Sequence, residues 1–182
     1  VGALVLTACS SQRGGDGDET DTPSDVDTTF VFGSSGDPSS LDPAFASDGE
    51  SFRISRQIFE GLVGVEPGTA DPAPLLAKSW TMSDDGLSYT FQLEEGVTFH
   101  DGTDFNAEAV CFNFDRQNGF TGVAQSASLS YYWGALMRGY ADTGTSIYDG
   151  CEVVSDTEVT LKLTQPFAGF IPALSLPAFA IQ

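Results

Sequence analysis

A run of alternating apolar and polar residues at positions 87–93 constrains the fold more than any other segment of the chain. Its apolar members are Leu87, Tyr89, Phe91 and Leu93. Because successive side chains of a strand point to opposite faces, the alternation predicts a strand with one buried face. The dipeptide Asp85-Gly86 is a turn signal that would join this strand to a preceding one at residues 79–82. The sequence therefore predicts a sheet that covers a core.

A helix is predicted to begin after Asn106 and to end at Gly119. Asn106 is a favourable N-cap, and Glu108 in the first turn suits the helix dipole. The apolar stripe of this helix comprises Ala107, Val110, Cys111 and Phe114. A second, weaker helical stripe comprises Tyr132, Trp133, Leu136, Met137 and Tyr140.

Shorter elements are expected on both sides of these. A helix at residues 50–60 would bury Ile54, Ile58 and the following Leu62, and Gly61 would end it in the left-handed conformation. A further helix at residues 167–174 is interrupted by Pro172. Strands are expected at residues 28–33, 62–65 and 96–99, and as a closing hairpin at 153–163. This order predicts a mixed α/β (α+β) fold.

Composition excludes several classes of protein. With 41% hydrophobic and 12% aromatic residues, the chain can pack a core and is not wholly disordered. The 26 acidic and 7 basic residues give a net charge of −19, so we expect no nucleic-acid partner. No apolar run approaches the roughly 18–20 residues that a membrane-spanning helix needs.

The first nine residues look like the end of a secretory signal, because an apolar stretch leads to small residues and a cysteine. Leu6-Thr7-Ala8-Cys9 matches the bacterial lipobox, in which the cysteine is lipidated; the alternative is a short buried strand ending in Cys9. Residues 10–29 are polar and acidic and read as a disordered tether without calcium-loop spacing. The chain starts with Val1 and stops in an apolar stretch, so we expect a fragment of a longer protein.

Residues that could perform chemistry are few. The single histidine, His100, stands beside Asp101 in a turn, where a structural role is the commoner one. The sequence contains no Gly-x-Ser-x-Gly elbow, no phosphate-binding loop and no Cys-x-x-Cys pair. We therefore predict no catalytic residue, no cofactor and no metal site.

Two cysteines, Cys111 and Cys151, remain once Cys9 is assigned to lipid. If the chain is exported, its compartment permits a disulfide between them. Closing that loop would stabilise the fold by roughly 4 kcal/mol on the chain-entropy model. The alternative is two free thiols, with Cys111 filling the helical stripe.

Residues 84–110, DDGLSYTFQLEEGVTFHDGTDFNAEAV, resemble the signature of the family 5 extracellular solute-binding proteins. These are the oligopeptide-, dipeptide- and nickel-binding lipoproteins of ABC importers. The resemblance runs from about Phe30 to the C-terminus, with one departure at Glu94-Glu95, where the family often has a basic residue. Flanking motifs agree in order, namely Ser40-Leu41-Asp42-Pro43, Ile58-Phe59-Glu60-Gly61-Leu62, Pro74-Leu75-Leu76-Ala77-Lys78-Ser79-Trp80 and Thr157-Glu158-Val159-Thr160-Leu161-Lys162-Leu163.

The resemblance implies the N-terminal part of a two-lobed, periplasmic-binding-protein-like fold with an inserted extra domain. By analogy, residues 30–59 start the first lobe, 60–164 form the extra domain and 165–182 return to the first lobe. It also implies a monomer, lipid-anchored to the outer face of the cytoplasmic membrane, that binds a peptide or similar solute and delivers it to ABC permease subunits. The alternatives are a secreted enzyme or sensory module on the same scaffold, and a lipoprotein adhesin.

The resemblance also places the ligand. Ser47, Asp48 and Gly49 would pair with the ligand backbone like an added strand, unless they merely cap a helix. Tyr131, Tyr132 and Trp133 would lie near the cleft, unless they belong to the core. Because a cleft binder encloses its ligand between two lobes, we expect these 182 residues alone to bind weakly. We also expect residues 167–181 to be frayed or aggregation-prone, because their apolar surfaces would lack partners.

Overall fold

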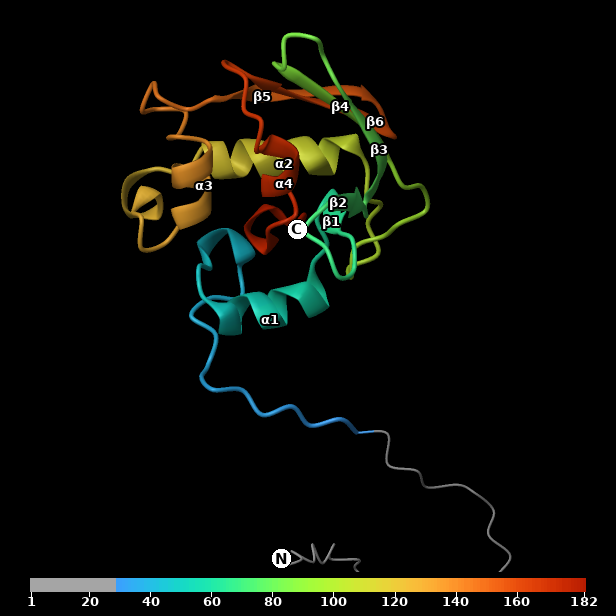
Figure 1. The fold of residues 1–182 in the computed structure, drawn as a ribbon. Coiled ribbons are helices and arrows are strands. Elements are labelled where there is room, and N and C mark those ends of the chain that lie inside the picture. Colours follow the sequence, from blue (N-terminus) through green and yellow to red (C-terminus); the bar gives the residue numbers. More distant parts are fainter. Residues whose placement is uncertain (1–28) are drawn as a thin grey trace, which may run out of the picture. The chain divides into compact units, whose positions relative to one another are not determined.

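A four-stranded antiparallel sheet with helix α2 (Ala107–Asn118) against it organises residues 34–182, which form one compact unit (Figure 1). The protein is represented by a computed structural model that describes residues 29–182. Cys9 and the predicted lipobox and tether up to residue 28 lie outside the described residues. The strand order is β3-β4-β6-β5, with bounds Ala77–Met82 for β3, Ser88–Leu93 for β4, Tyr148–Ser155 for β5 and Glu158–Leu163 for β6.

The remaining elements are short. Strands β1 (Val63–Val65) and β2 (Pro72–Pro74) form a separate two-stranded sheet. The helices are η1 (Pro43–Phe45), α1 (Gly49–Ile58), η2 (Gly122–Gln125), α3 (Tyr131–Leu136), α4 (Phe170–Ala173) and η3 (Pro177–Phe179). Within residues 29–182, none of these helices has the length and apolar character needed to cross a membrane.

The sheet confirms the prediction from alternating residues. Tyr89 pairs with Leu161 and Phe91 with Val159, and all four side chains are buried. The opposite face is polar, since Thr90 and Thr160 pair across the strands and their hydroxyl oxygens lie 2.9 Å apart. One face therefore covers the core, and the other carries hydrogen-bonding side chains.

Helix α2 also forms as predicted. The Asn106 side chain accepts a hydrogen bond from the Ala109 N–H at 2.9 Å, and Gly119 is the C-cap. The predicted apolar stripe is buried, and the Phe114 ring lies within 6.0–6.5 Å of the rings of Trp133, Tyr148 and Phe179. The helix is thus the centre of an aromatic core.

Two strand predictions are wrong. Residues 29–33 have no strand, because no strand within the described part of the chain pairs with them, and an isolated strand is not stable. Residues 96–99 contribute only an isolated bridge between Thr98 and Asp104.

The predicted buried face of α1 is wrong for Ile58, although the following Leu62 is buried as predicted. The helix buries Ser51 and Ser55, while Ile58 is 40% exposed. It ends before Phe59, which has an extended backbone, and Gly61 does not adopt a positive φ. Gly61 instead permits a close approach, since a Cβ there would lie 3.1 Å from the Leu174 carbonyl oxygen.

The C-terminal segment is packed and not frayed, which corrects the expectation for residues 167–181. Phe170, Leu174, Phe179 and Ile181 are each at most 4% exposed and belong to the same hydrophobic cluster as the sheet. Ile181 also donates a backbone hydrogen bond to the Glu60 carbonyl at 2.8 Å. The division at residues 60–164 and 165–182 stays a prediction, because one core spans both ranges.

Candidate functional site

Residues 46–48 lead into α1, which begins at Gly49, and the backbone is extended at both Ala46 and Asp48. Ala46 has φ −102° and ψ 142°, and Asp48 has φ −109° and ψ 156°. Ala46 is buried, whereas Ser47 and Gly49 are exposed. An exposed extended backbone is the geometry to which a peptide can add as a strand.

The Asp48 carboxylate is occupied within the fold. It is the N-cap of α1 and accepts from the Ser51 N–H at 2.8 Å, from the Ser51 hydroxyl at 2.8 Å and from the Ser39 hydroxyl at 2.5 Å. These bonds, with that of Ser39 the largest cause, lower the pKa of Asp48 to about 2. The Asp48 side chain therefore caps α1, as the alternative interpretation expected. The predicted pairing with a ligand concerns the main chain of this segment and stays a prediction.

The three predicted aromatic residues have different surroundings. Tyr131 is 48% exposed, and Tyr132 is half-buried against Phe52 of α1, with ring centroids 5.6 Å apart. Trp133 is 1% exposed, and its indole N–H donates to the Gly139 carbonyl at 3.1 Å. Trp133 is a core residue in this structure and presents no surface to a ligand; Tyr131 does.

The structure brings the two predicted sets together. Helix η1, just before the extended segment, contacts both α1 and α3. The contact between Phe52 and Tyr132 joins the first turns of the same two helices. The extended segment and Tyr131 are therefore held by neighbouring elements. Tyr131 also lines a hollow of about 410 Å³ with Ser130 and Tyr140.

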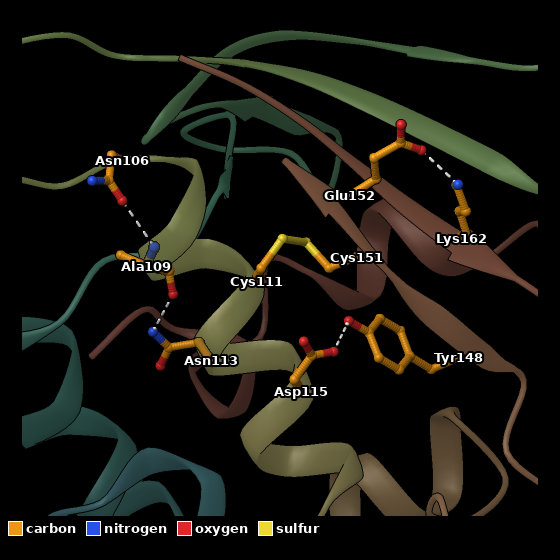
Figure 2. Close-up of a disulfide and its surroundings, with 9 residues drawn as sticks. All are labelled: Asn106, Ala109, Cys111, Asn113, Asp115, Tyr148, Cys151, Glu152 and Lys162. Carbon is orange, nitrogen blue, oxygen red and sulfur yellow. Dashed lines mark hydrogen bonds and ion pairs between the residues drawn. A yellow bond between two sulfur atoms is a disulfide. The ribbon is translucent and has the colours of Figure 1, made fainter. Parts of the chain in front are cut away.

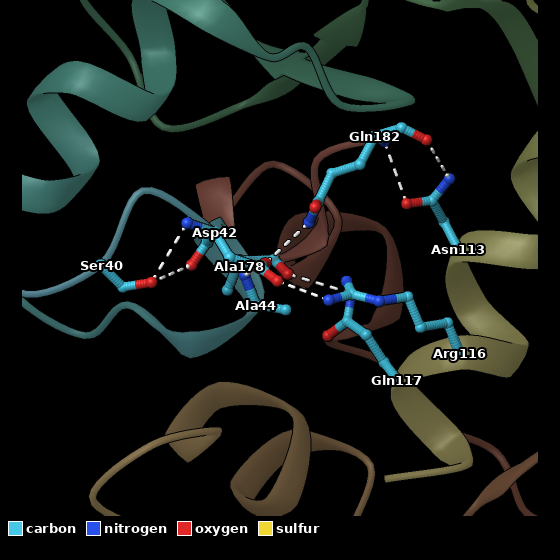
Figure 3. Close-up of polar contacts among 8 residues, drawn as sticks. All are labelled: Ser40, Asp42, Ala44, Asn113, Arg116, Gln117, Ala178 and Gln182. Carbon is cyan, nitrogen blue, oxygen red and sulfur yellow. Dashed lines mark hydrogen bonds and ion pairs between the residues drawn. The ribbon is translucent and has the colours of Figure 1, made fainter. Parts of the chain in front are cut away.

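Sequence reasoning missed a polar cluster around Asp42, which caps η1 just before this segment (Figure 3). Asp42 forms an ion pair with Arg116 of α2, 74 positions away, at 2.5 Å, and also accepts from the Gln182 side-chain amide at 2.9 Å. Gln182 in turn exchanges two hydrogen bonds with Asn113 of α2. The only sequence signal was the Leu41-Asp42-Pro43 motif, which does not identify a partner so distant in the chain.

A disulfide between Cys111 and Cys151 links α2 to β5 (Figure 2). The Cα atoms are 5.2 Å apart, within the roughly 7 Å limit for an unstrained bridge. Two hydrogen bonds lie close by in the same view: the Ala109 N–H donates to the Asn106 side-chain oxygen, and the Tyr148 hydroxyl donates to the Asp115 carboxylate. The bridge therefore fastens the helix to an edge strand of the sheet.

Other chemistry-bearing groups are not gathered into a centre. His100 is exposed and lines a cavity of about 420 Å³ together with Asp101, Phe59 and Phe105. Among residues 29–182, no group of His, Cys, Asp and Glu side chains is arranged to hold a metal ion.

Comparison with known proteins decides the family. The family model of bacterial extracellular solute-binding proteins, family 5 Middle, matches residues 71–182. The chain belongs to this family. The structural neighbours of this family 5 protein share its mixed helices and sheets, as part of a two-lobed fold.

Individual relatives of the family 5 protein carry different names. It is 33% identical to "Heme-binding protein A" of Haemophilus influenzae over 98% of this chain and 34% of that protein. It is 38% identical to "Glutathione-binding protein GsiB" of Escherichia coli K12 over 78% of this chain and 24% of that protein.

A solved structure shares the fold. "ABC transporter-associated periplasmic binding protein DppA from Helicobacter pylori in complex with peptide STSA" superimposes with a TM-score of 0.66 and 32% identity, covering 80% of this chain and 29% of that chain. The family 5 chain thus spans about a quarter to a third of the length of these relatives.

Proposed function

We propose that this family 5 protein captures peptides, or a related small solute, outside the cytoplasmic membrane and delivers them to an ABC permease. It performs no reaction, and binding consists of closing two lobes around the solute. The proposal includes a first lobe that starts at residues 30–59, an inserted domain at 60–164 and a return to the first lobe at 165–182.

The observation that carries the proposal is the extended backbone at residues 46–48, exposed at Ser47, between elements that contact α3, the helix of the exposed Tyr131. A peptide that adds to this edge is held by main-chain hydrogen bonds, which do not depend on its sequence. The exposed Tyr131 ring on the neighbouring helix α3 supplies apolar contact at a low cost in conformational entropy. The Helicobacter pylori relative, whose solved structure contains the peptide STSA, supports a peptide as the solute.

The names of the other relatives bear on the solute class. They refer to heme and glutathione, and glutathione is itself a small peptide. A main-chain edge and one aromatic side chain recognise a peptide-like group without fixing its length. We therefore propose short peptides, and Ser47, Asp48, Gly49, Tyr131 and Tyr132 as the part of the site within this chain.

Membrane attachment is proposed to occur through Cys9. Two or more acyl chains on one cysteine anchor a protein stably where a single chain does not. The Cys9→Ala variant of the full-length protein should move from the membrane fraction to the soluble extracytoplasmic fraction. Unchanged membrane retention of the variant, with no lipid label on the wild type, would rule out the anchor.

The binding proposal is tested with the full-length protein and an equimolar mixture of synthetic tri-, tetra- and pentapeptides. Native mass spectrometry should detect retained peptides, and calorimetry should then measure the affinity of the peptide that is retained best. Tyr131→Ala should weaken that affinity about tenfold, because an exposed aromatic contact is lost. The matched control is Val154→Ala, which removes a similarly exposed apolar side chain from strand β5.

Three results would contradict the proposal. Retention of no peptide would remove the peptide class, and cleavage of retained peptides would favour the enzyme alternative. Equal affinities of the full-length protein and of residues 1–182 would show that one lobe is enough and that the proposed enclosure between lobes is wrong.

A further inference from the structure

The Asp42 carboxylate holds three separate segments together. One of its oxygens accepts from the Ala44 N–H at 3.0 Å and from the Gln182 side-chain amide at 2.9 Å. The bond from Ala44 caps the start of η1. The other oxygen forms the ion pair with Arg116. Both charged side chains are only a quarter to a third exposed, at 26% and 28%. A charge-assisted bond in such a partly buried place is stronger than one at the open surface.

Arg116 makes a second contact with the same loop. Its guanidinium carbon lies 5.9 Å from the centre of the Phe45 ring and 5.3 Å from that of Phe120. The two rings stack on each other with centroids 4.7 Å apart. One arginine at the end of α2 therefore fixes η1 through an ion pair and through a cation–π contact.

The extended segment is thus fixed at both ends. On one side, η1 is tied to α2 by Asp42 and Phe45. On the other side, Asp48 caps α1 and accepts from Ser39 and Ser51. Between them, Ala46 is 1% exposed and leaves little freedom for the backbone.

We propose that the Asp42–Arg116 ion pair is a positioning device that preorganises residues 46–48 for solute binding. The inference rests on the proposed function, because it assigns to these two residues the shape of the proposed ligand-facing edge. Neither side chain has to touch the solute. A rigid binding edge loses less conformational entropy on binding than a mobile one. The affinity for the solute therefore depends on the Asp42–Arg116 ion pair, which keeps the edge rigid.

The test compares variants of the full-length protein. Arg116→Met removes the charge and keeps the aliphatic stem, Arg116→Lys keeps a charge without the planar guanidinium, and Asp42→Asn keeps an acceptor for the Ala44 N–H. The matched control is Lys162→Met, which removes the exposed ion pair with Glu152 on the polar face of the sheet. Three quantities are measured: hydrogen exchange over residues 43–49 without peptide, the affinity for the peptide retained best from the synthetic mixture, and the midpoint of thermal unfolding.

Arg116→Met and Asp42→Asn should each raise exchange over residues 43–49 and weaken peptide binding about tenfold. The double variant Arg116→Met with Asp42→Asn should bind no more weakly than the weaker single variant, because either single change already removes the shared ion pair. Arg116→Lys should recover part of the affinity, and Lys162→Met should change neither exchange nor affinity.

The inference is overturned if the affinity and the exchange at residues 43–49 stay at wild-type values. It is also overturned if Arg116→Met lowers the unfolding midpoint and the affinity while exchange at residues 43–49 does not change, which is the behaviour of a purely structural residue. The two failures are separable. If the wild type retains no peptide, the proposed function is wrong, whereas wild-type binding with unaffected variants refutes only the positioning role.

Discussion

The two faces of helix α2 are fixed to the rest of the protein by different chemistry. One face meets strand β5 through the Cys111–Cys151 disulfide and the bond from the Tyr148 hydroxyl to Asp115 (Figure 2). On the same face the Phe114 ring stacks on that of Tyr148, with centroids 6.0 Å apart. The other face meets η1 and residues 178–182 through polar side chains (Figure 3), although the Phe114 ring also lies 6.5 Å from that of Phe179. These side chains are Asn113, Arg116 and Gln117.

The difference separates what holds the fold from what shapes the site. The face toward the sheet buries aromatic surface and carries a covalent bond, so it supplies more of the stability. The polar face gains less free energy, because each hydrogen bond replaces one to water. The Gln117 side-chain oxygen is even buried with no hydrogen-bond partner within residues 29–182. Directional polar contacts nevertheless fix the position of η1, which precedes the proposed ligand-facing edge.

The largest effect is expected for Phe114→Ala on the face toward the sheet. Phe114 is 2% exposed and its ring lies near three other aromatic rings. Truncating such a residue leaves a cavity and should lower the free energy of unfolding by about 3–5 kcal/mol. Urea denaturation measures this loss, with the exposed Phe112→Ala on the same helix as the control. A loss below that of the control would mean that the aromatic cluster is not the main support of α2.

The second largest effect is expected from the disulfide. The bridge closes a separation of 40 residues, so Cys111→Ala with Cys151→Ala should destabilise the protein by roughly 2–4 kcal/mol. Peptide mapping without reductant should find the two cysteines joined in protein from its native compartment. Quantitative alkylation of both thiols without reduction, or equal stability of the double variant, would favour the alternative of free thiols.

The first face of α2 could be predicted from the sequence, and the second could not. The stripe containing Val110, Cys111 and Phe114 follows from local spacing, and so does the Asn106 cap. Asn113 and Arg116 occur in the same helix, but their partners Gln182 and Asp42 are 69 and 74 positions away. No local pattern identifies such pairs, because a polar residue on a helix is usually solvated.

The candidate site shows the same limit. The resemblance identified Ser47–Gly49 and Tyr131–Trp133 as neighbours of a ligand, but not which side chains point outward. Consecutive residues of a helix point in different directions, so Tyr131 is exposed while Trp133 is buried. The strand predicted at residues 28–33 failed for a related reason, since a strand depends on a partner that its own sequence does not contain.

On the polar face, Asn113→Ala tests how much the contacts with residue 182 contribute. Asn113 is 3% exposed and exchanges two hydrogen bonds of 3.0 Å with the Gln182 backbone. Its loss leaves buried backbone groups without partners and should cost about 1–3 kcal/mol. Urea denaturation compares it with Gln92→Ala, which removes an exposed hydrogen bond to Glu158 on the polar face of the sheet. A loss as large as that of Phe114→Ala would remove the proposed difference between the two faces.

The smallest effect at neutral pH concerns Tyr148, which makes a side-chain hydrogen bond on the face toward the sheet. Its hydroxyl donates to the Asp115 carboxylate at 2.7 Å, and the side chain is 4% exposed. Burial, reinforced by the hydrogen bond to Asp115 and by its charge, raises the pKa of Tyr148 far above the ordinary value of 10.0. Tyr148→Phe should therefore cost only about 1 kcal/mol at pH 7, where the hydroxyl is neutral in both the folded and the unfolded protein.

In alkali the free energy of unfolding should fall more steeply with pH for the wild type than for Tyr148→Phe. Above pH 10 the unfolded chain loses the Tyr148 proton, whereas the folded protein keeps it. The free energy of unfolding is therefore unaffected below pH 10 and falls as the pH rises above it, by about 1.4 kcal/mol per pH unit for one group. Tyr148→Phe should remove this share of the slope. Burial also raises the pKa of Tyr89 on strand β4, so Tyr89→Phe is the matched variant, which leaves the bond between Tyr148 and Asp115 in place. Urea denaturation between pH 9 and pH 11 should show a shallower decline for each variant than for the wild type. An unchanged slope in Tyr148→Phe would mean that this hydroxyl ionises in the folded protein, and that the face toward the sheet admits water at Asp115.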